Sequence, residues 1–282
     1  MSIGADHSTF PRCPRSGSNT FAERNTRLRL GIRPRRDAAT TCAGVPALKE
    51  WLPAVAALES GDQTVLFRKG GIREPAFTPA APAFLLFPTA FHTDAQLLKP
   101  WASDKYRAQC AADPRASPML ALSCWAEVTG AWTTTDTGAL PALHPLHIHG
   151  DAFLEARLRW RPKQPITILE LRAYRHAPAP APARGPARGP PSLCALRRGH
   201  CSADVAPALG RRLREAMLLP SRDEYWGCFS WVQLEAAGPA AQLKERAVPA
   251  LDDDAFAARQ RELRGRLAEL EDLRALAPRF AA

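Results

Sequence analysis

The sequence lacks several features that would assign the protein to a well-defined class. No run of roughly 18 or more apolar residues is present, so we expect no membrane-spanning helix. The first residues lack the apolar core of a secretory signal. The seven cysteines are scattered without a Cys-x-x-Cys pair, which argues against a disulfide framework. Together these absences predict reduced thiols and a cytoplasmic protein.

Familiar catalytic motifs are also missing. The sequence contains no Gly-x-Ser-x-Gly, no P-loop, no dinucleotide fingerprint and no His-Glu-x-x-His. The Asp…Glu-x-Lys spacing of a metal-dependent nuclease is absent too, because Arg172 stands where its lysine would follow Glu170. The sequence therefore names no reaction, and we expect no cofactor and no resident metal.

What the sequence has is an excess of positive charge. Lys and Arg together number 38 against 28 acidic residues, which gives a net charge of +10. Residues 1–36 carry eight arginines and two acids, and so hold +6 of this excess. A basic segment can bind nucleic acid through phosphate contacts, or it can be a tail without a specific partner. We expect residues 1–42 to form a disordered basic tail.

We expect the rest of the chain to form one domain followed by a helix. Residues 43–250 are read as a single α+β domain, and residues 251–282 as a C-terminal helix and tail. The Pro/Ala-rich residues 177–192 indicate an extended linker. Because a strand-like segment, Cys228–Leu234, follows this linker, we interpret the linker as an insertion within one domain.

Apolar patterns predict the elements of that domain. A helix is expected to begin near Pro46 and to be kinked or shortened by Pro53. Two further helices are expected near 94–99 and 150–157. The strand-like runs are Thr64–Arg68, Ala83–Phe87, Met119–Thr135, Ile166–Arg175 and Cys228–Leu234. So many strands with few crossover helices predict a mixed or barrel-like sheet.

The C-terminal helix has a recognisable start. Asp252-Asp253-Asp254 would cap it and complement its dipole. The helix can pack on the body of the protein or form a coiled-coil homodimer. Its apolar stripe consists of Phe256, Leu263, Leu267, Leu270 and Leu273.

The segment Gly61–Ile72 combines a glycine turn, a short apolar strand, two cations and two more glycines. Adjacent strand residues point to opposite faces, so either Arg68 or Lys69 must face inward or into a cleft. Gly70 and Gly71 would let the backbone approach a ligand. The pattern Gly61-x-Gln63-x-x-x-x-Arg68 resembles the Gly-x-Lys-x-x-x-x-Arg signature of ASCH domains. That resemblance implies a PUA-like barrel that binds RNA or modified nucleotides, although Gln63 replaces the usual lysine.

A longer resemblance covers about residues 46–235. Several sequence blocks are similar to a bacterial family of domains of unknown function, number 1802. The resemblance implies a single bacterial cytoplasmic domain and no known activity. The blocks are Leu48–Trp51, Arg68–Ile72, Phe84–Thr89, Leu98–Pro100, Leu171–Arg175 and Gly227–Val232.

A second basic stretch, Arg157–Lys163, interleaves four cations with Trp160. This composition suits a nucleic-acid groove, with charge for phosphates and an aromatic plane for a base. It also suits a strand edge blocked against pairing. The first hypothesis is therefore a binding module for RNA or a nucleotide. Its expected binding residues are Arg68, Lys69, Gly70, Gly71, Arg157, Arg159, Trp160, Lys163 and Arg172.

The alternative is a hydrolase-type enzyme that acts on a small anionic or modified-nucleoside substrate. Lys69, Glu74 and His92 would be its catalytic groups if they converge in one pocket. His147 and His149 share a face in an extended segment and could bind zinc with His92 or a cysteine. Alternatively, His147 is a hydrogen-bonded, semi-buried side chain and His149 is exposed.

The thiol of Cys228 has two interpretations. We expect a buried core residue rather than a nucleophile.

Overall fold

The computed structural model describes residues 44–70, 76–90, 95–176 and 217–276. Contacts divide the chain into Met1–Thr41 and Cys42–Ala282, and every described residue belongs to the second unit. The predicted basic tail and the Pro/Ala linker lie outside the described residues. Within the described ranges, no helix is long and apolar enough to cross a membrane.

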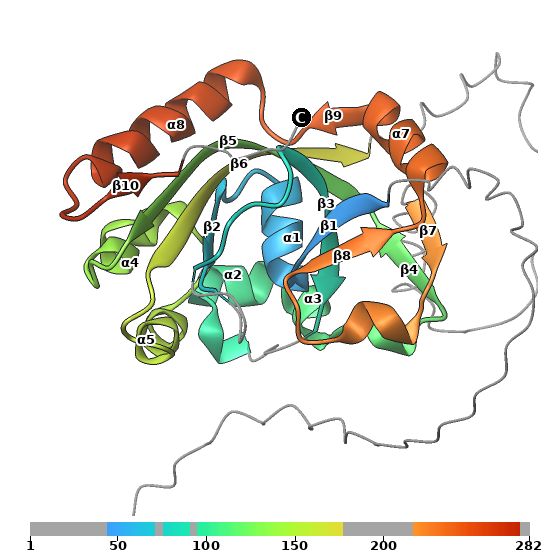
Figure 1. Ribbon diagram of the computed structural model, residues 1–282, viewed down its shortest axis with the longest axis horizontal. Helices are drawn as coiled ribbons and strands as arrows, with labels where there is room; N and C mark the ends of the chain where they lie inside the picture. Colours follow the sequence, from blue (N-terminus) through green and yellow to red (C-terminus); the bar gives the residue numbers. More distant parts are fainter. Residues whose placement is uncertain (1–43, 71–75, 91–94, 177–216, 277–282) are drawn as a thin grey trace, which may run out of the picture. The chain divides into compact units, whose positions relative to one another are not determined.

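The domain is α+β, as predicted, and is built on a mixed sheet of eight strands (Figure 1). The main path has the order β2-β6-β5-β3-β1-β8, with β9 added to β6 and β10 added to β5. Only β1 and β3 run parallel among these pairs. The strands are β1 (Val45–Trp51), β2 (Val65–Arg68), β3 (Ala83–Thr89), β5 (Cys124–Thr134), β6 (Ile166–His176), β8 (Trp231–Leu234), β9 (Ala247–Pro249) and β10 (Arg274–Ala275).

The sheet is open, because β2 and β8 are its two ends and do not pair with each other in the described part of the chain. A separate antiparallel pair joins β4 (Met119–Leu122) to β7 (Met217–Pro220). The expected run Met119–Thr135 is therefore two strands that belong to two sheets, separated at Ser123. The other predicted strands are present with small shifts at their ends.

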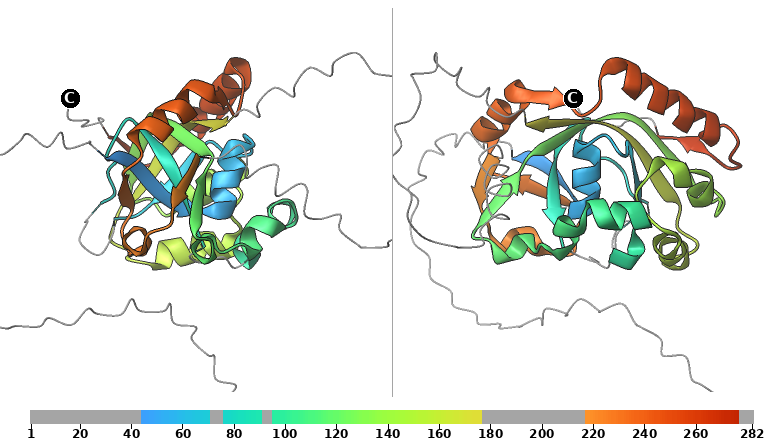
Figure 2. Two further views of the ribbon diagram at one scale, coloured as in Figure 1. Left: turned by 90° about the vertical axis from the view of Figure 1, so that its right-hand side faces the viewer. Right: turned by 180° about the vertical axis from the view of Figure 1, so that it is seen from behind.

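One face of the sheet is covered by helix α1 (Leu52–Glu59), as Figure 2 shows. Successive strand residues point to opposite faces, so Leu66 packs in the α1 layer while Val65 and Phe67 pack on the other side. In β6, Leu169, Leu171 and Ala173 also join the α1 layer, as their alternation predicted. Small helices α2 (Pro100–Lys105) and α3 (Arg107–Ala111) lie beside α1.

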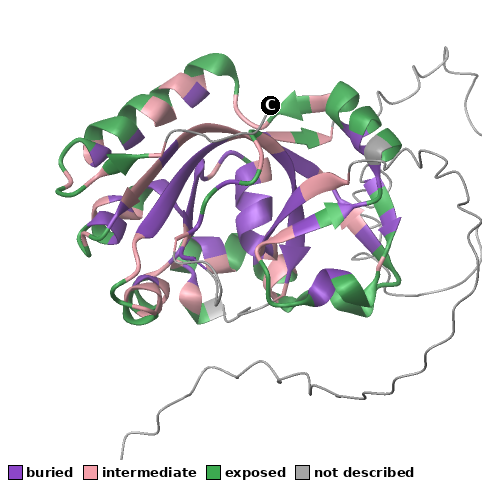
Figure 3. Cartoon of the chain, viewed as in Figure 1, coloured by how far each residue is buried: buried purple, intermediate pink, exposed green. Residues whose placement is uncertain are grey.

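The opposite face carries two separate hydrophobic clusters. At the β2 end, β2 and β6 pack against α4 (Ala139–Ala142), α5 (Asp151–Arg159) and α8 (Asp253–Leu267). At the β8 end, β1 and β3 pack against the β4–β7 pair and α7 (Ala237–Arg246). Figure 3 shows α1 and the central strands of the sheet buried, with β9, β10 and the outer faces of α7 and α8 mainly exposed.

The expectation of a helix from Pro46 is wrong in its first half. Residues Val45–Trp51 form strand β1, and the helix begins only at Leu52. Strand β1 contributes Leu48 to the core on the α1 side and Ala47 to the cluster on the opposite side, so both of its faces are buried and its apolar residues need not alternate. Pro53 does not kink α1. It occupies the first turn, where a missing N–H group costs little.

The C-terminal helix α8 starts as predicted. The side chain of Asp252 accepts a hydrogen bond from the Ala255 N–H at 2.7 Å. Its apolar residues Phe256, Leu263 and Leu267 are buried against the body of the domain. The fully buried Glu170 of β6 also holds α8, because it accepts hydrogen bonds from Gln260 and Arg264. A dimer through this helix stays a prediction.

Two glycines in different backbone conformations should respond in opposite ways to alanine. Gly61 has φ +74°, and an added Cβ would lie 2.4 Å from a methyl carbon of Leu251. Gly265 lies inside α8 with nothing within 4 Å of an added Cβ. We expect Gly61→Ala to lower the free energy of unfolding by about 1 kcal/mol or more, and Gly265→Ala to raise it by about 0.5–1 kcal/mol. Urea denaturation of both variants measures this difference, and a change of the same sign in both would contradict it.

Candidate functional site

The end of strand β2 sends its two cations to opposite faces of the sheet, as the sequence predicted. Arg68 is the last residue of β2 and pairs with Thr167 of β6. Its guanidinium lies on the α1 side, 5.2 Å from the ring centroid of Phe77. Lys69 follows and points to the other side, where α5 ends. Arg68 and Lys69 are therefore neighbours in the chain, but their side chains have different surroundings on the two faces of the sheet.

Arg68 is tied to strand β1. One nitrogen of its guanidinium donates to a carboxylate oxygen of Glu50 at 3.0 Å and to the Lys49 carbonyl at 3.1 Å. The other oxygen of Glu50 accepts from the Trp51 N–H, and Thr89 of β3 donates to the Glu50 carbonyl. Arg68 and Glu50 retain 15% and 11% of their side-chain exposure, so the pair lies just below the surface. Strands β1, β2 and β3 thus meet at this ion pair.

Lys69 is buried but has no carboxylate partner in the described residues. Its ammonium donates to the backbone carbonyls of Trp160 at 2.8 Å and Arg161 at 3.3 Å. Burial lowers the pKa of Lys69, and the neighbouring charge of Arg157 lowers it further. These carbonyls belong to the turn after α5, so Lys69 joins β2 to the basic stretch 157–163.

Arg157 completes a group of three cations, which we call the cationic cluster: Arg68, Lys69 and Arg157. Burial lowers the pKa of Arg157 to about 10, and the charge of Arg68 contributes, whereas Glu50 opposes the shift. Arg157 also lies 5.0 Å from the ring centroid of Phe153. The charge of Arg157 thus acts on Lys69 and the charge of Arg68 acts on Arg157, while Glu50 is the one carboxylate in ion-pair contact with the cluster among the described residues. The cluster therefore keeps a net positive charge.

The rim of the cluster is exposed. Trp160 is 36% exposed, and the guanidinium of Arg161 lies 5.0 Å from its ring centroid. Lys163 is exposed on the following turn. Arg159 is exposed too, but it forms an ion pair with Glu155 at 2.6 Å on the same helix.

The structure places Arg172 elsewhere. It forms an ion pair with Asp253 of α8 and lies 5.2 Å from the Phe256 ring centroid. Gly70 is described and buried next to Lys69. Gly71, Glu74 and His92 lie outside the described residues, so their predicted roles stay predictions.

Gln63, which stands where the ASCH signature has lysine, has a structural role here. Its side-chain amide donates to the Val65 carbonyl at 3.1 Å and accepts from the Ile148 N–H at 3.1 Å. It is fully buried, and so it holds the His147–His149 segment against the start of β2. A lysine could not accept the Ile148 hydrogen bond.

The predicted exposure of His149 is wrong, because His149 is 3% exposed and stacks on Phe153 at 3.9 Å between ring centroids. His147 is 1% exposed and accepts a hydrogen bond from the His149 N–H. Burial, with the charges of Lys99 and His144, lowers the pKa of His147 to about 3. No cluster of metal-binding side chains is present among the residues that the structure describes.

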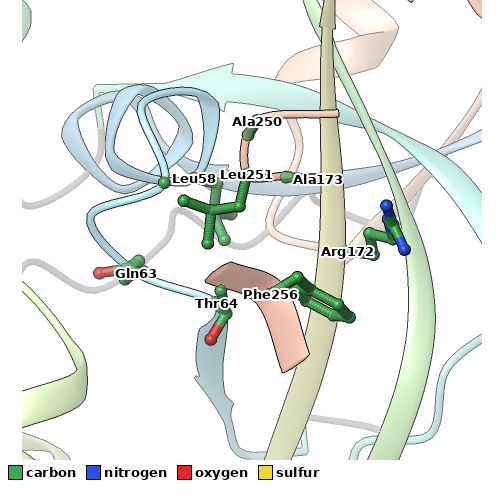
Figure 4. Close-up of a pocket in the computed structure, with 9 residues that line it drawn as sticks. Leu58, Gln63, Thr64, Arg172, Ala173, Ala250, Leu251 and Phe256 are labelled. Atoms are coloured by element: carbon green, nitrogen blue, oxygen red, sulfur yellow. The ribbon is translucent and has the colours of Figure 1, made fainter. Parts of the chain in front are cut away.

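A small pocket lies away from the cationic cluster, between α1, β6 and the start of α8 (Figure 4). Leu58, Ala173, Leu251 and Phe256 give it a mainly apolar lining, with Arg172 at one side. Its volume of about 10 Å³ has room for one water molecule at most, so it is not a ligand site in this conformation.

Sequence reasoning missed Glu50 as a site residue. The signal was present in the block Leu48–Trp51, where two charged residues interrupt an otherwise apolar strand. An acid in a buried strand requires a partner, but the sequence does not say that the partner is Arg68.

The fold and the cluster define an α+β domain with a cationic site at the end of one sheet strand. The chain belongs to the family described as "Domain of unknown function (DUF1802)", whose model matches residues 47–211, more than half of the chain. No curated protein matches it.

Three solved structures resemble part of the chain. The crystal structure of ASCH from Zymomonas mobilis has a TM-score of 0.27 at 12% identity, and the match covers 45% of this chain and 66% of that chain. Two mutant proteins of it give TM-scores of 0.29 at 13% identity, over 45% and 46% of this chain and 66% and 72% of theirs. This chain therefore spans just under two thirds of the length of the first of these proteins. ASCH is the class that the Gly61–Arg68 pattern resembles.

The buried histidines should make the fold acid-sensitive. His147 has a folded-state pKa of about 3 against about 6.5 when unfolded, so only the unfolded chain gains its proton between these values. Stability should therefore fall as the pH drops below about 6.5. We expect His147 alone to remove about 2 kcal/mol of unfolding free energy between about pH 7 and pH 5.

Urea denaturation at the two pH values measures this loss. His147→Gln, which does not titrate, should shrink the difference between the two pH values by that amount, whatever it does to stability at neutral pH. An unchanged difference in the variant would show that His147 is not the cause.

Proposed function

We propose that the protein is a binding module for single-stranded RNA or another nucleotide, with its site at the cationic cluster and its rim. The observation that carries this proposal is the convergence of Arg68, Lys69 and Arg157 with Glu50 as their one ion-paired carboxylate in the described residues. Holding like charges together is costly, and a bound anion would relieve that cost.

The rim supports a nucleic acid over a small inorganic anion. Trp160 presents part of its ring to solvent beside Arg161 and close to Lys163. Bases stack on exposed aromatic rings, and phosphates bind the cations beside them. A single strand can offer both groups at once, because its bases are not already paired.

The surroundings of Lys69 bear on the enzyme alternative. The Lys69 ammonium is directed at two backbone carbonyls, which suits a positioning role better than proton transfer. Because Glu74 and His92 lie outside the described residues, no observation favours the hydrolase, and we do not propose it. The cytoplasmic location, the bacterial origin and a dimer stay predictions.

Binding to a fluorescein-labelled oligouridine, followed by anisotropy, tests the proposal. We expect affinity to fall steeply between about 50 mM and 200 mM salt, because each phosphate contact releases counterions. Arg157→Gln should weaken binding and reduce the slope of log affinity against log salt by about 0.7–1. Trp160→Ala should weaken binding by about 1–3 kcal/mol and leave this slope unchanged, because a stacking contact releases no counterion.

The matched control is Arg261→Gln, which removes an exposed arginine from α8. It makes the same change in net charge as Arg157→Gln and should alter neither affinity nor slope appreciably. Salt-independent binding, no binding, or equal effects of both arginine variants would reject the cationic cluster as the site.

A further inference from the structure

Three aromatic rings form a stack beside the cationic cluster. Trp51 is the last residue of β1, and its ring centroid lies 6.0 Å from that of His149, with 13° between the two planes. His149 also stacks on Phe153 of α5, with 3.9 Å between centroids and 12° between planes. These side chains come from separate parts of the chain, so only the fold brings them together.

Both ends of the stack contact groups of the site. At one end, the backbone N–H of Trp51 donates at 2.8 Å to Glu50, the carboxylate that Arg68 binds. At the other end, the guanidinium of Arg157 lies 5.0 Å from the Phe153 ring centroid. The stack therefore borders the site that we propose for RNA.

Two ring nitrogens of this stack are buried without a hydrogen-bond partner among the described residues. They are Nε1 of Trp51 and Nδ1 of His149, in residues that are 6% and 3% exposed. A buried polar group without a partner costs free energy, so each one requires an explanation. The indole nitrogen of Trp51 can only donate, and the partner that it lacks is therefore an acceptor.

The surroundings of His149 favour an acceptor with negative charge. Burial lowers the pKa of His149 well below its ordinary value, and the charges of His147, Arg157 and Lys99 lower it further. The ring is therefore neutral near pH 7 and carries one N–H group. An anion at the stack would offset the neighbouring positive charges and accept hydrogen bonds from both rings.

Lys99 brings a fourth cation to this region. Its backbone N–H donates at 2.9 Å to the carbonyl of Ile148, the residue before His149. Its ammonium donates to the His147 carbonyl at 2.5 Å. Burial lowers the pKa of Lys99, and the exposed Asp151 opposes this shift without forming an ion pair with the lysine.

The charge balance selects the kind of phosphate. Arg68, Lys69, Arg157 and Lys99 share one ion-paired carboxylate, Glu50, in the part of the chain that the structure describes. A phosphate within a nucleic acid strand carries one negative charge, whereas a terminal phosphate carries about −1.5 to −2 and offers three acceptor oxygens. The burial of the stack also suits a chain end better than a strand that must continue in both directions.

We propose that Trp51 and His149 form a recognition site for the terminal phosphate of single-stranded RNA. This proposal rests on the RNA-binding function and names the part of the RNA that reaches the inner end of the cationic cluster. The indole N–H of Trp51 donates to one phosphate oxygen and Nδ1–H of His149 to another, while the cations balance the charge. Trp160 on the rim remains the residue that stacks on a base.

Anisotropy titrations of the full-length protein with oligouridines that differ at one end test this proposal. One pair carries fluorescein at the 3′ end and either a phosphate or a hydroxyl at the 5′ end. The second pair is labelled at the 5′ end and differs in the same way at the 3′ end. We expect the phosphate to raise affinity at least about tenfold in one of the two pairs, because charge-assisted hydrogen bonds then satisfy the unpaired donors.

Two variants separate recognition from packing. Trp51→Phe keeps a ring in the stack and removes its N–H, and His149→Phe removes both ring nitrogens. Each should reduce the preference for the phosphate end about tenfold and change affinity for the hydroxyl end by less than about twofold. The matched control is Trp125→Phe, because Trp125 of β5 also has a buried indole nitrogen without a partner but stacks on Tyr174. It should leave the preference unchanged.

The outcomes distinguish this proposal from the RNA-binding function on which it rests. Equal affinities for phosphate and hydroxyl ends in both pairs, with binding that still weakens with salt, would overturn the end recognition and leave the RNA-binding function intact. No binding to any of the oligouridines would reject both. An equal loss of preference in Trp51→Phe and Trp125→Phe would also overturn the proposal, because it would assign the effect to packing.

Discussion

Strand β6 is the constraint on which the rest of the domain depends. It pairs with β2 on one side and with β5 on the other, and β9 extends the pairing of its last residues. Its odd-numbered residues Leu169 and Leu171 face α1, whereas the buried Glu170 between them holds α8. Because alternation fixes both faces at once, a shift of one residue in this register would expose the core and displace α8.

The same alternation separates neighbouring charged residues in β1 and at the end of β2. At the end of β2, Arg68 and Lys69 leave the strand on opposite sides, and Arg157 of α5 approaches both. In β1, Glu50 turns toward Arg68 while Lys49 turns toward loop 227–230. Two neighbouring charged residues in one buried strand thus have different partners, Arg68 on one face of the sheet and the Gly227 carbonyl on the other.

Much of this architecture could be predicted from the sequence. Strands β2, β3 and β6 are visible as apolar runs, and the α8 start is marked by Asp252. The helix expected from Pro46 is wrong in its first half, where the structure has strand β1. A strand that is buried on both faces lacks the alternation of apolar and polar residues that would distinguish it from a helix. The predicted exposure of His149 and the predicted burial of Cys228 are also wrong, because His149 is buried and Cys228 is exposed. Exposure depends on the elements that pack on a residue and not on the residue type alone.

The sequence by itself determined the α+β class and most of the strands, because these depend on composition and short-range periodicity, which are local. The resemblance of its sequence blocks to known proteins indicated the family. Only the tertiary structure decided that Arg68 pairs with Glu50, that Lys69 binds the carbonyls after α5, and that Lys49 lies beneath loop 227–230. Such contacts join residues far apart in the chain, so they depend on strand order and register, which local patterns do not specify.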